Sequence, residues 1–240
     1  MPASLGPRVS WRRCNDLREG PALSSKAPLH PDKPDVPDAI LPAMFDGRLD
    51  RLHLEGASLS RVDLSNQIAS DIGLEQCRLD RVDLTGARLS GTLLQDTVVS
   101  AGSWANVRTQ GLRLKRVAFT GVRITGADLS ASALEDVLFR DCRIDLASLR
   151  LAKLMRVRFE SCRMDEIDFG GAQLSSVDFA GCALIRALWT EATLTRCEMR
   201  DSDISGARNP ERLRGVRMPW LDVLAAAAEL AAAVGVEIVD

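Results

Sequence analysis

The sequence predicts an all-β solenoid of about eight four-sided coils, closed by a C-terminal α-helical cap. Every fifth residue from Leu49 to Ile204 is large and apolar, with Ala69 and Thr109 as the exceptions. Neither an α-helix nor a simple strand has a period of five residues. The pentads align again in fours, so about twenty residues form one coil of a repeat array. Because neighbouring strands lie about 4.8 Å apart, eight coils build a rod of roughly 38 Å.

Each pentad is predicted to point one large and one small side chain into the rod, because residues two apart on extended backbone share a face. Glycines such as Gly56 and Gly126 follow the large residue by two positions, where a corner needs the positive φ that glycine adopts without steric cost. Two stacked columns are expected to form the core. They are Leu54, Leu74, Leu94, Leu114, Leu134, Leu154, Leu174 and Leu194, and Phe119, Phe139, Phe159 and Phe179.

Two stretches fit the repeat less well. Gln67 and Ala69 fill inward positions poorly. Between Thr97 and Thr109 the inward positions hold threonines and the large Trp104, so we expect distorted corners there. One interpretation is a harmless variation in packing, and the other is a local bulge that a partner recognises.

Several pentads have the form Ala-(Asp/Asn)-Leu-x-x or a close variant. Residues 126–130 read Gly-Ala-Asp-Leu-Ser, and residues 61–65 read Arg-Val-Asp-Leu-Ser. With these pentads in phase over about two thirds of the chain, the sequence resembles the pentapeptide-repeat family. That resemblance implies a right-handed quadrilateral β-helix, and it says much less about function.

The remaining segments flank the array. Residues 1–38 contain seven prolines and few aliphatic residues, so we expect a disordered Pro-rich tail. Residues 39–208 are expected to form the β-helix. Its first part, residues 39–48, would be the N-terminal cap, because an uncovered first coil exposes apolar core and unpaired strand edges.

Residues 209–240 are expected to form a C-terminal helix and tail that cap the rod or join two rods. Pro219 can begin a helix, and Gly235 can end it. Apolar residues recur between them at helical spacing: Trp220, Val223, Leu224, Leu230 and Val234. This C-terminus is similar to that of the MfpA/Qnr quinolone-resistance group, a resemblance that implies a homodimer of rods joined end to end. An exposed apolar helix face also favours an isologous pair.

No constellation of catalytic residues is apparent, so an enzyme is not predicted. His30 falls in the tail, and His53 is isolated near the first coil, whereas nucleophilic catalysis needs a histidine beside the nucleophile. Cys142, Cys162 and Cys182 share one inward column with valines, which indicates small buried hydrophobic residues. We therefore expect neither a metal nor a cofactor, and unpaired cysteines are typical of the reducing cytoplasm.

The formal net charge is −2, and no apolar run is long enough to span a membrane. Acidic and basic residues alternate along the rod, so direct nucleic-acid binding is not expected. These features favour a rigid rod that binds an unidentified protein partner. The alternative, implied by the resemblance, is a DNA-mimicking modulator of DNA gyrase that protects it from fluoroquinolones or other inhibitors. Such mimicry requires a continuous negative field.

Overall fold

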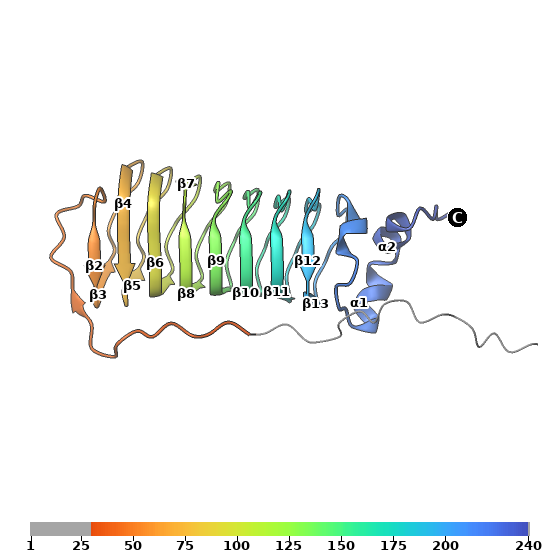
Figure 1. Ribbon diagram of the computed structural model, residues 1–240, viewed down its shortest axis with the longest axis horizontal. Coiled ribbons are helices and arrows are strands. Elements are labelled where there is room, and N and C mark those ends of the chain that lie inside the picture. Colours follow the sequence, from red (N-terminus) through yellow and green to blue (C-terminus); the bar gives the residue numbers. More distant parts are fainter. Residues whose placement is uncertain (1–29, 240) are drawn as a thin grey trace, which may run out of the picture.

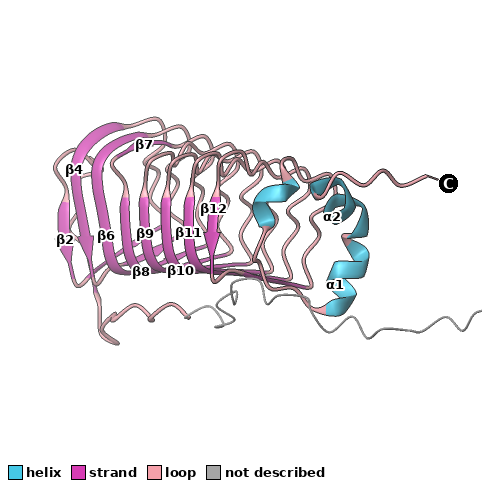
Figure 2. Ribbon diagram, turned by 45° about the vertical axis from the view of Figure 1, so that its right-hand side comes forward, coloured by secondary structure: helices cyan, strands magenta, loops and turns pink. Residues whose placement is uncertain are grey.

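The computed structural model describes residues 30–239, which form one rod of stacked coils with short helices at one end (Figures 1 and 2). Every strand pairing is parallel, and along the rod each strand residue faces the residue twenty positions later, as Leu154 faces Leu174. The strands are β1 (Leu41–Pro42), β2 (His53–Glu55), β3 (Ala57–Ser60), β4 (Ile68–Glu75), β5 (Arg78–Asp80), β6 (Arg88–Ser100), β7 (Arg108–Gln110), β8 (Arg113–Thr120), β9 (Ala133–Arg140), β10 (Lys153–Glu160), β11 (Gln173–Ala180), β12 (Thr193–Thr195) and β13 (Glu198–Arg200). The predicted β-solenoid of about eight coils with a helical C-terminal end is confirmed.

The coil has four sides because four sets of pairings recur within each twenty-residue step. In one coil these are Ser58 with Arg78, Asp63 with Asp83, Ile68 with Arg88 and Gly73 with Leu93. Backbone hydrogen bonds therefore run from coil to coil along the rod, and each coil is held by its two neighbours, as in other solenoids.

The corners have one conformation throughout the array. Every fifth residue from Arg51 to Gly206 has a positive φ, between 46° and 72°. Glycine occupies only some of these positions, and Leu146 and Leu151 adopt φ values of 58° and 57°. The left-handed conformation costs a non-glycine residue roughly 1–2 kcal/mol. Contacts with neighbouring coils must therefore offset this cost. One such contact is the hydrogen bond that the Leu146 amide donates to the Asp165 carbonyl at 2.9 Å.

The predicted core columns lie inside the rod. The leucines from Leu74 to Leu174 and all four phenylalanines are buried, whereas Leu54 and Leu194, at the two ends, are partly buried. The phenylalanine rings stack with centroids 4.9, 5.0 and 5.1 Å apart and with planes within 11° of parallel. This spacing follows from the distance between coils, so the ring stack continues the strand register into the core.

The expectation of distorted corners between Thr97 and Thr109 is wrong. Ala101 and Asn106 adopt φ values of 50° and 54°, like the corners elsewhere, and Ser103 and Arg108 pair with residues twenty positions later. Thr97 fits the core because its hydroxyl donates to the carbonyls of Gln95 at 2.8 Å and Leu74 at 3.3 Å. The polar group is thus satisfied without disturbing the coil.

At the N-terminal end, β1 lies beside β3, and the Ala43 amide donates to the Ser58 carbonyl at 2.9 Å. Gln67, which had looked like a poor core residue, has a role here. Its side-chain Oε1 accepts from the Leu49 amide at 3.0 Å, and its Nε2 donates to the Gly47 carbonyl at 2.8 Å. A side chain from the second coil thus replaces the missing backbone partners of the chain that enters the rod.

At the C-terminal end the chain forms the 3₁₀ helix η1 (Pro210–Leu213) and two short helices, α1 (Trp220–Ala225) and α2 (Ala227–Ala233). The prediction of one continuous helix from Pro219 to Gly235 is therefore wrong. The break is at Ala226, whose φ and ψ are −96° and 17° and whose side chain is buried against the core. The domain boundaries after residues 38 and 208 remain predictions, and residues 1–29 of the expected tail lie outside the described residues.

Candidate interaction surfaces

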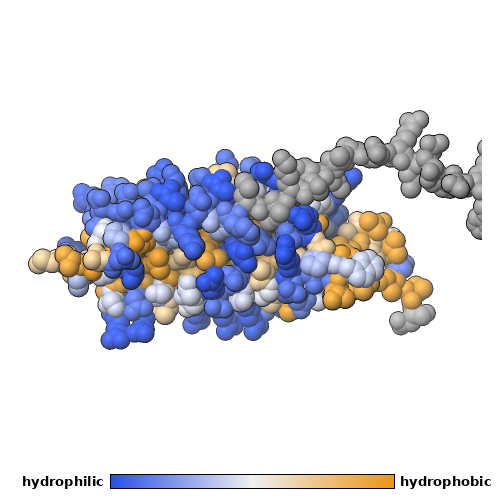
Figure 3. Space-filling model, turned by 90° about the horizontal axis from the view of Figure 1, so that it is seen from below, coloured by the Kyte–Doolittle hydropathy of each residue, from blue (hydrophilic) through white to orange (hydrophobic). Residues whose placement is uncertain are grey.

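The predicted cap and dimer residues fall into two groups. Val223 and Leu230 are partly buried, and Leu230 packs against the core of the rod. Trp220, Leu224 and Val234 are 70%, 52% and 77% exposed. Leu221, which the sequence did not single out, is 75% exposed beside them. We call Trp220, Leu221, Leu224 and Val234 the end patch, and Figure 3 shows apolar residues gathered at this end of the rod.

Two acidic side chains attach α1 and α2 to the last coil. In the body of the rod a corner amide donates to a carbonyl of the next coil, as Arg186 does to Ser205 at 2.8 Å. The corresponding amides of Asp201 and Gly206 have no further coil to meet. They donate instead to Asp222 Oδ2 at 2.7 Å and Glu229 Oε1 at 2.9 Å. The carboxylates thus replace the carbonyls of a missing coil, and the helices lie with their outer face uncovered.

A second surface lies along one corner of the rod, where oppositely charged residues alternate from coil to coil. Arg116 Nε donates to Asp96 Oδ1 at 2.6 Å, and Nη2 donates to Oδ2 of the same carboxylate. Arg156 binds Asp136 in the same two-pronged way, at 2.6 and 2.7 Å, and also donates to Glu135 at 2.6 Å. Such paired contacts fix both the position and the charge of a carboxylate.

The N-terminal residues 30–37, which we call the strap, run back along this corner toward the start of the rod (Figure 1). The Asp32 amide donates to Asp136 Oδ1 at 3.1 Å, and the Asp35 amide donates to Asp96 Oδ1 at 3.1 Å. The carboxylates of Asp96 and Asp136 are only 6% and 5% exposed. Two nearly buried acids of the rod therefore receive backbone amides of the strap.

These contacts decide the charge of both acids. Hydrogen bonding from Arg116 lowers the pKa of Asp96 against the opposing effect of burial, and the Asp35 amide acts in the same direction. Burial is the largest influence on the pKa of Asp136 and would raise it. Hydrogen bonds from Arg156 and the Asp32 amide outweigh burial, so the pKa is lowered. Both carboxylates are thus charged acceptors at neutral pH.

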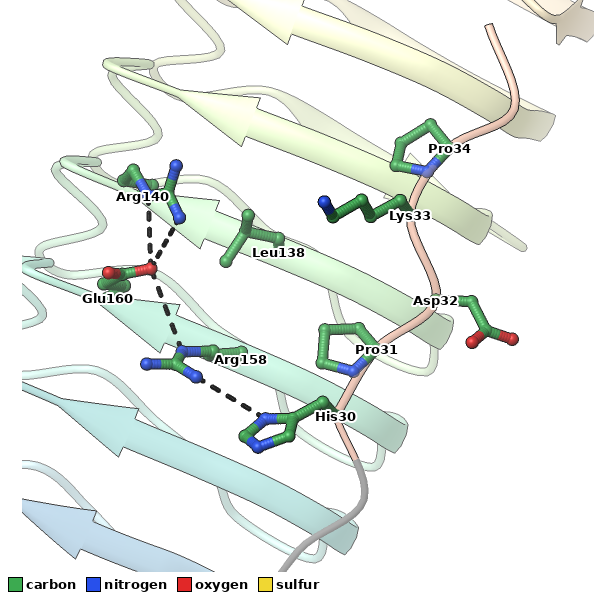
Figure 4. A pocket seen from close by; sticks show the side chains of 9 residues that line it. All are labelled: His30, Pro31, Asp32, Lys33, Pro34, Leu138, Arg140, Arg158 and Glu160. Atoms are coloured by element: carbon green, nitrogen blue, oxygen red, sulfur yellow. Dashed lines mark hydrogen bonds and ion pairs between the residues drawn. The ribbon is translucent and has the colours of Figure 1, made fainter.

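A cavity of about 250 Å³ lies between the strap and the strands β9 and β10. Its rod side consists of Leu138, Arg140, Arg158 and Glu160, and its strap side runs from His30 to Pro34 (Figure 4). Arg158 stands 3.5 Å from the His30 ring and 3.8 Å from Glu160, which Arg140 contacts at 2.9 Å. Leu138 faces Pro31 across the cavity, while the Asp32 carboxylate points away from the rod.

Sequence reasoning missed this surface, although two signals were present. Pro31, Pro34 and Pro37 recur every three residues, which is typical of a polyproline II segment rather than of a featureless tail. Val98, Ala118 and Leu138 occupy an outward position of successive coils where Arg78 and Arg158 stand elsewhere. All three apolar residues are partly buried. An outward apolar column in a charged rod indicates a covered surface.

The described residues offer no arrangement for a metal, since no group of three or more histidine, cysteine or acidic side chains converges among them. Likewise, none of the helices in the described part of the chain is long and apolar enough to cross a membrane. His53 lies 3.5 Å from Asp71, and both side chains are largely exposed.

The family models that match this chain cover parts of its repeat array. A model of the pentapeptide repeat region matches residues 132–208, and a model of eight pentapeptide repeats matches residues 49–96. None of the curated proteins matches the chain.

Two solved structures are among those to which the chain is similar. A trypsin-treated variant of QnrB1, a plasmid-mediated fluoroquinolone resistance protein, is 15% identical and has a TM-score of 0.43, covering 78% of this chain and 98% of its own. HetL from the cyanobacterium Nostoc sp. strain PCC 7120, a pentapeptide repeat protein involved in heterocyst differentiation regulation, is 19% identical. Its TM-score is 0.31, and the match covers 71% of this chain and 88% of its own.

Proposed function

The chain belongs to the pentapeptide-repeat family, and from that premise we propose that it is a non-enzymatic protein-interaction rod that forms a homodimer through its C-terminal end. The observation that carries the proposal is the end patch. Four large apolar side chains are exposed on α1 and just after α2, and these helices already make polar contacts to their own coil through Asp222 and Glu229. Apolar area gathered in this way marks an interaction site, and a patch at one end suits a two-fold pair.

A rod of this kind suits a scaffold better than a catalyst. The core is continuous from Leu49 to Leu213, and several charged groups on the surface of the rod pair with one another. Arg143 pairs with Asp145, Arg163 with Asp165 at 2.8 Å, and Arg186 with Glu166 at 2.7 Å. The five described cysteines are free and buried, which fits the cytoplasmic location that we propose.

The experiment that tests the dimer is light scattering coupled to size-exclusion chromatography. We expect the wild-type protein to have twice the 26.1 kDa mass of one chain. The variant Leu221→Lys/Leu224→Lys should have the mass of a single chain, because charge at the centre of an apolar interface is costly. Leu146→Lys is the matched control, since Leu146 is 59% exposed on a corner of the rod and should leave the dimer intact. A monomeric wild type would refute the proposal.

Gyrase modulation by DNA mimicry stays outside this proposal, because the chain has nearly as many basic as acidic residues, 31 Lys and Arg against 33 Asp and Glu. Asp96, Asp136 and Glu198 each pair with an arginine, at 2.6 Å or closer. A phosphate-like field would need acids without such partners. A supercoiling assay with purified gyrase, with and without a fluoroquinolone, decides the point. We expect neither inhibition nor protection at tens of micromolar protein.

A further inference from the structure

We propose that the corner of the rod beneath the strap is a binding site for proline-rich segments in the polyproline II conformation, and that the strap is its resident ligand. The proposal names a partner chemistry for the interaction rod and rests on that function only in treating the rod as a binding module. The site is separate from the end patch, so peptide binding and dimer formation succeed or fail independently. We call the surface formed by Asp96, Arg116, Asp136, Arg156 and Leu138 the strap face.

The spacing of the strap matches that of the rod. Asp32 and Asp35 are three residues apart, and their acceptors Asp136 and Asp96 are two coils apart. Three residues of polyproline II rise about 9.3 Å, and two strand spacings amount to about 9.6 Å. A segment with three residues per turn can therefore place one equivalent amide on every second coil. The corner residues of the rod alternate with the same spacing. Arg116 occupies the coil between those of Asp96 and Asp136, so an aspartate acceptor is present on every second coil.

The strap has the sequence that this spacing requires. Residues 31–37 read Pro-Asp-Lys-Pro-Asp-Val-Pro, so the residue after each of the first two prolines is the one that donates its amide. Pro31 and Pro34 are partly buried, whereas the side chains of Asp32 and Lys33 are exposed. The rod thus contacts prolines and backbone amides, which any segment of the form Pro-x-x-Pro-x can supply. Proline-rich segments suit such recognition because their polyproline II conformation is formed before they bind.

The strap face also carries a charge preference. The Arg116 guanidinium is held by Asp96, and the nearby charges of Asp136 and Asp32 act with it to raise the pKa of Arg116. Arg140 and Arg158 line the cavity at the other end of the strap. An acidic residue after the proline, as Asp32 is in the strap, adds to the negative charge that stabilises the Arg116 guanidinium. The external partner that fits is a proline-rich segment with acidic residues between its prolines.

The strap is held weakly enough to be displaced. Within the described residues, its direct hydrogen bonds to the rod are the two amide contacts and the longer contact between His30 and Arg158. Segments with so few contacts open at low cost in free energy. The strap remains attached through β1, and a tethered ligand of this length competes at an effective concentration of roughly millimolar. An external peptide must therefore compete with the strap before it binds.

The test uses the full chain and a labelled peptide with the sequence of residues 30–37, His-Pro-Asp-Lys-Pro-Asp-Val-Pro. In the variant Asp32→Pro/Asp35→Pro both amide donors are removed while the polyproline II preference is kept. We expect this variant to bind the peptide at least about tenfold more tightly than the wild type, because the competing strap is released. Lys33→Pro is the matched control. It adds a proline where the described contacts include no amide bond to the rod, and it should behave like the wild type.

Two further measurements make the result decisive. A peptide with proline at both aspartate positions should not bind the released variant, and Asp136→Asn within that variant should weaken binding of the original peptide about tenfold. Asparagine tolerates the left-handed corner conformation, so this change removes the charge while the coil stays folded, as circular dichroism would verify. NMR relaxation of the Lys33 and Val36 amides should show the strap detached in the variant.

Three results would overturn the proposal. The first is equal binding of the original peptide by the wild type and the released variant. The second is equal binding of the two peptides. The third is a strap that stays attached without its two amides, since those amides would then not be what the rod recognises.

Discussion

The body of the rod and its boundaries are held by different kinds of interaction. An interior coil such as residues 133–152 lies between two near-copies of itself, and its backbone, core and corners repeat those of its neighbours. At the ends and beneath the strap the partners are single polar side chains: Gln67 at the start, Asp222 and Glu229 at the finish, and Asp96 and Asp136 along the corner. The repeat therefore explains the body of the rod, whereas individual residues explain its two ends and the attachment of the strap.

The largest expected effect lies in the interior. Phe139→Ala should lower the free energy of unfolding by about 3–5 kcal/mol, because it leaves a cavity between two stacked rings. Leu54→Ala is the comparison at the end of the rod. It should cost less, since Leu54 is only partly buried. Urea unfolding followed by circular dichroism measures both. Equal losses would contradict the distinction between interior and ends.

The next effect concerns the C-terminal boundary. Asp222→Ala/Glu229→Ala should cost about 2 kcal/mol in total, because the amides of Asp201 and Gly206 lose charged acceptors. The loss should appear as faster hydrogen exchange in α1, α2 and the last coil, with the central coils unchanged. Glu237→Ala, on the exposed tail, is the control. A uniform rise in exchange along the whole rod would show that the cap does not act locally.

Substitutions at the corner residues should change the free energy of unfolding by a smaller amount, in either direction. Leu146→Gly should stabilise the rod by about 0.5 kcal/mol, because relief of a left-handed φ of 58° exceeds the entropic cost of glycine. Gly171→Ala should destabilise it by about 1–2 kcal/mol, since φ is 66° and a Cβ would lie 2.8 Å from Leu151 Cδ2. Thermal unfolding of the two variants compares them. A destabilising Leu146→Gly would mean that the leucine contributes packing that outweighs its strain.

The smallest expected effect on global stability is the response of the strap to acid. The pKa values of Asp96 and Asp136 are lowered in the folded protein. The stability that these carboxylates contribute is therefore complete at a pH above the unfolded pKa of about 3.9. It is lost as the pH falls through the lower pKa values of the folded protein. NMR signals of the Asp32 and Asp35 amides should be constant from neutral pH to about pH 4 and should move together below it. A change centred between pH 6 and 7 would show that these two carboxylates do not control the strap.

The sequence predicted the parts of the molecule that repeat. Phe139, Phe159 and Phe179 could be assigned to the core because each occurs at the same phase of its coil, and the strands followed from that phase. The helix break at Ala226 could not be predicted, because helix periodicity continues through it and the break depends on how Ala226 packs against the last coil. Nor could the pairing of Asp32 with Asp136, since the contact joins residues 104 positions apart with no repeat to relate them.

The central claim, that two rods join through their C-terminal ends, is tested most directly by small-angle X-ray scattering of the wild-type protein. An end-to-end dimer predicts twice the mass of one chain and a maximum dimension about twice that of a single rod, whose eight coils alone span roughly 38 Å. The end-patch variant Leu221→Lys/Leu224→Lys should return both values to those of one rod. The mass of a single chain, or a dimer no longer than one rod, would contradict the account.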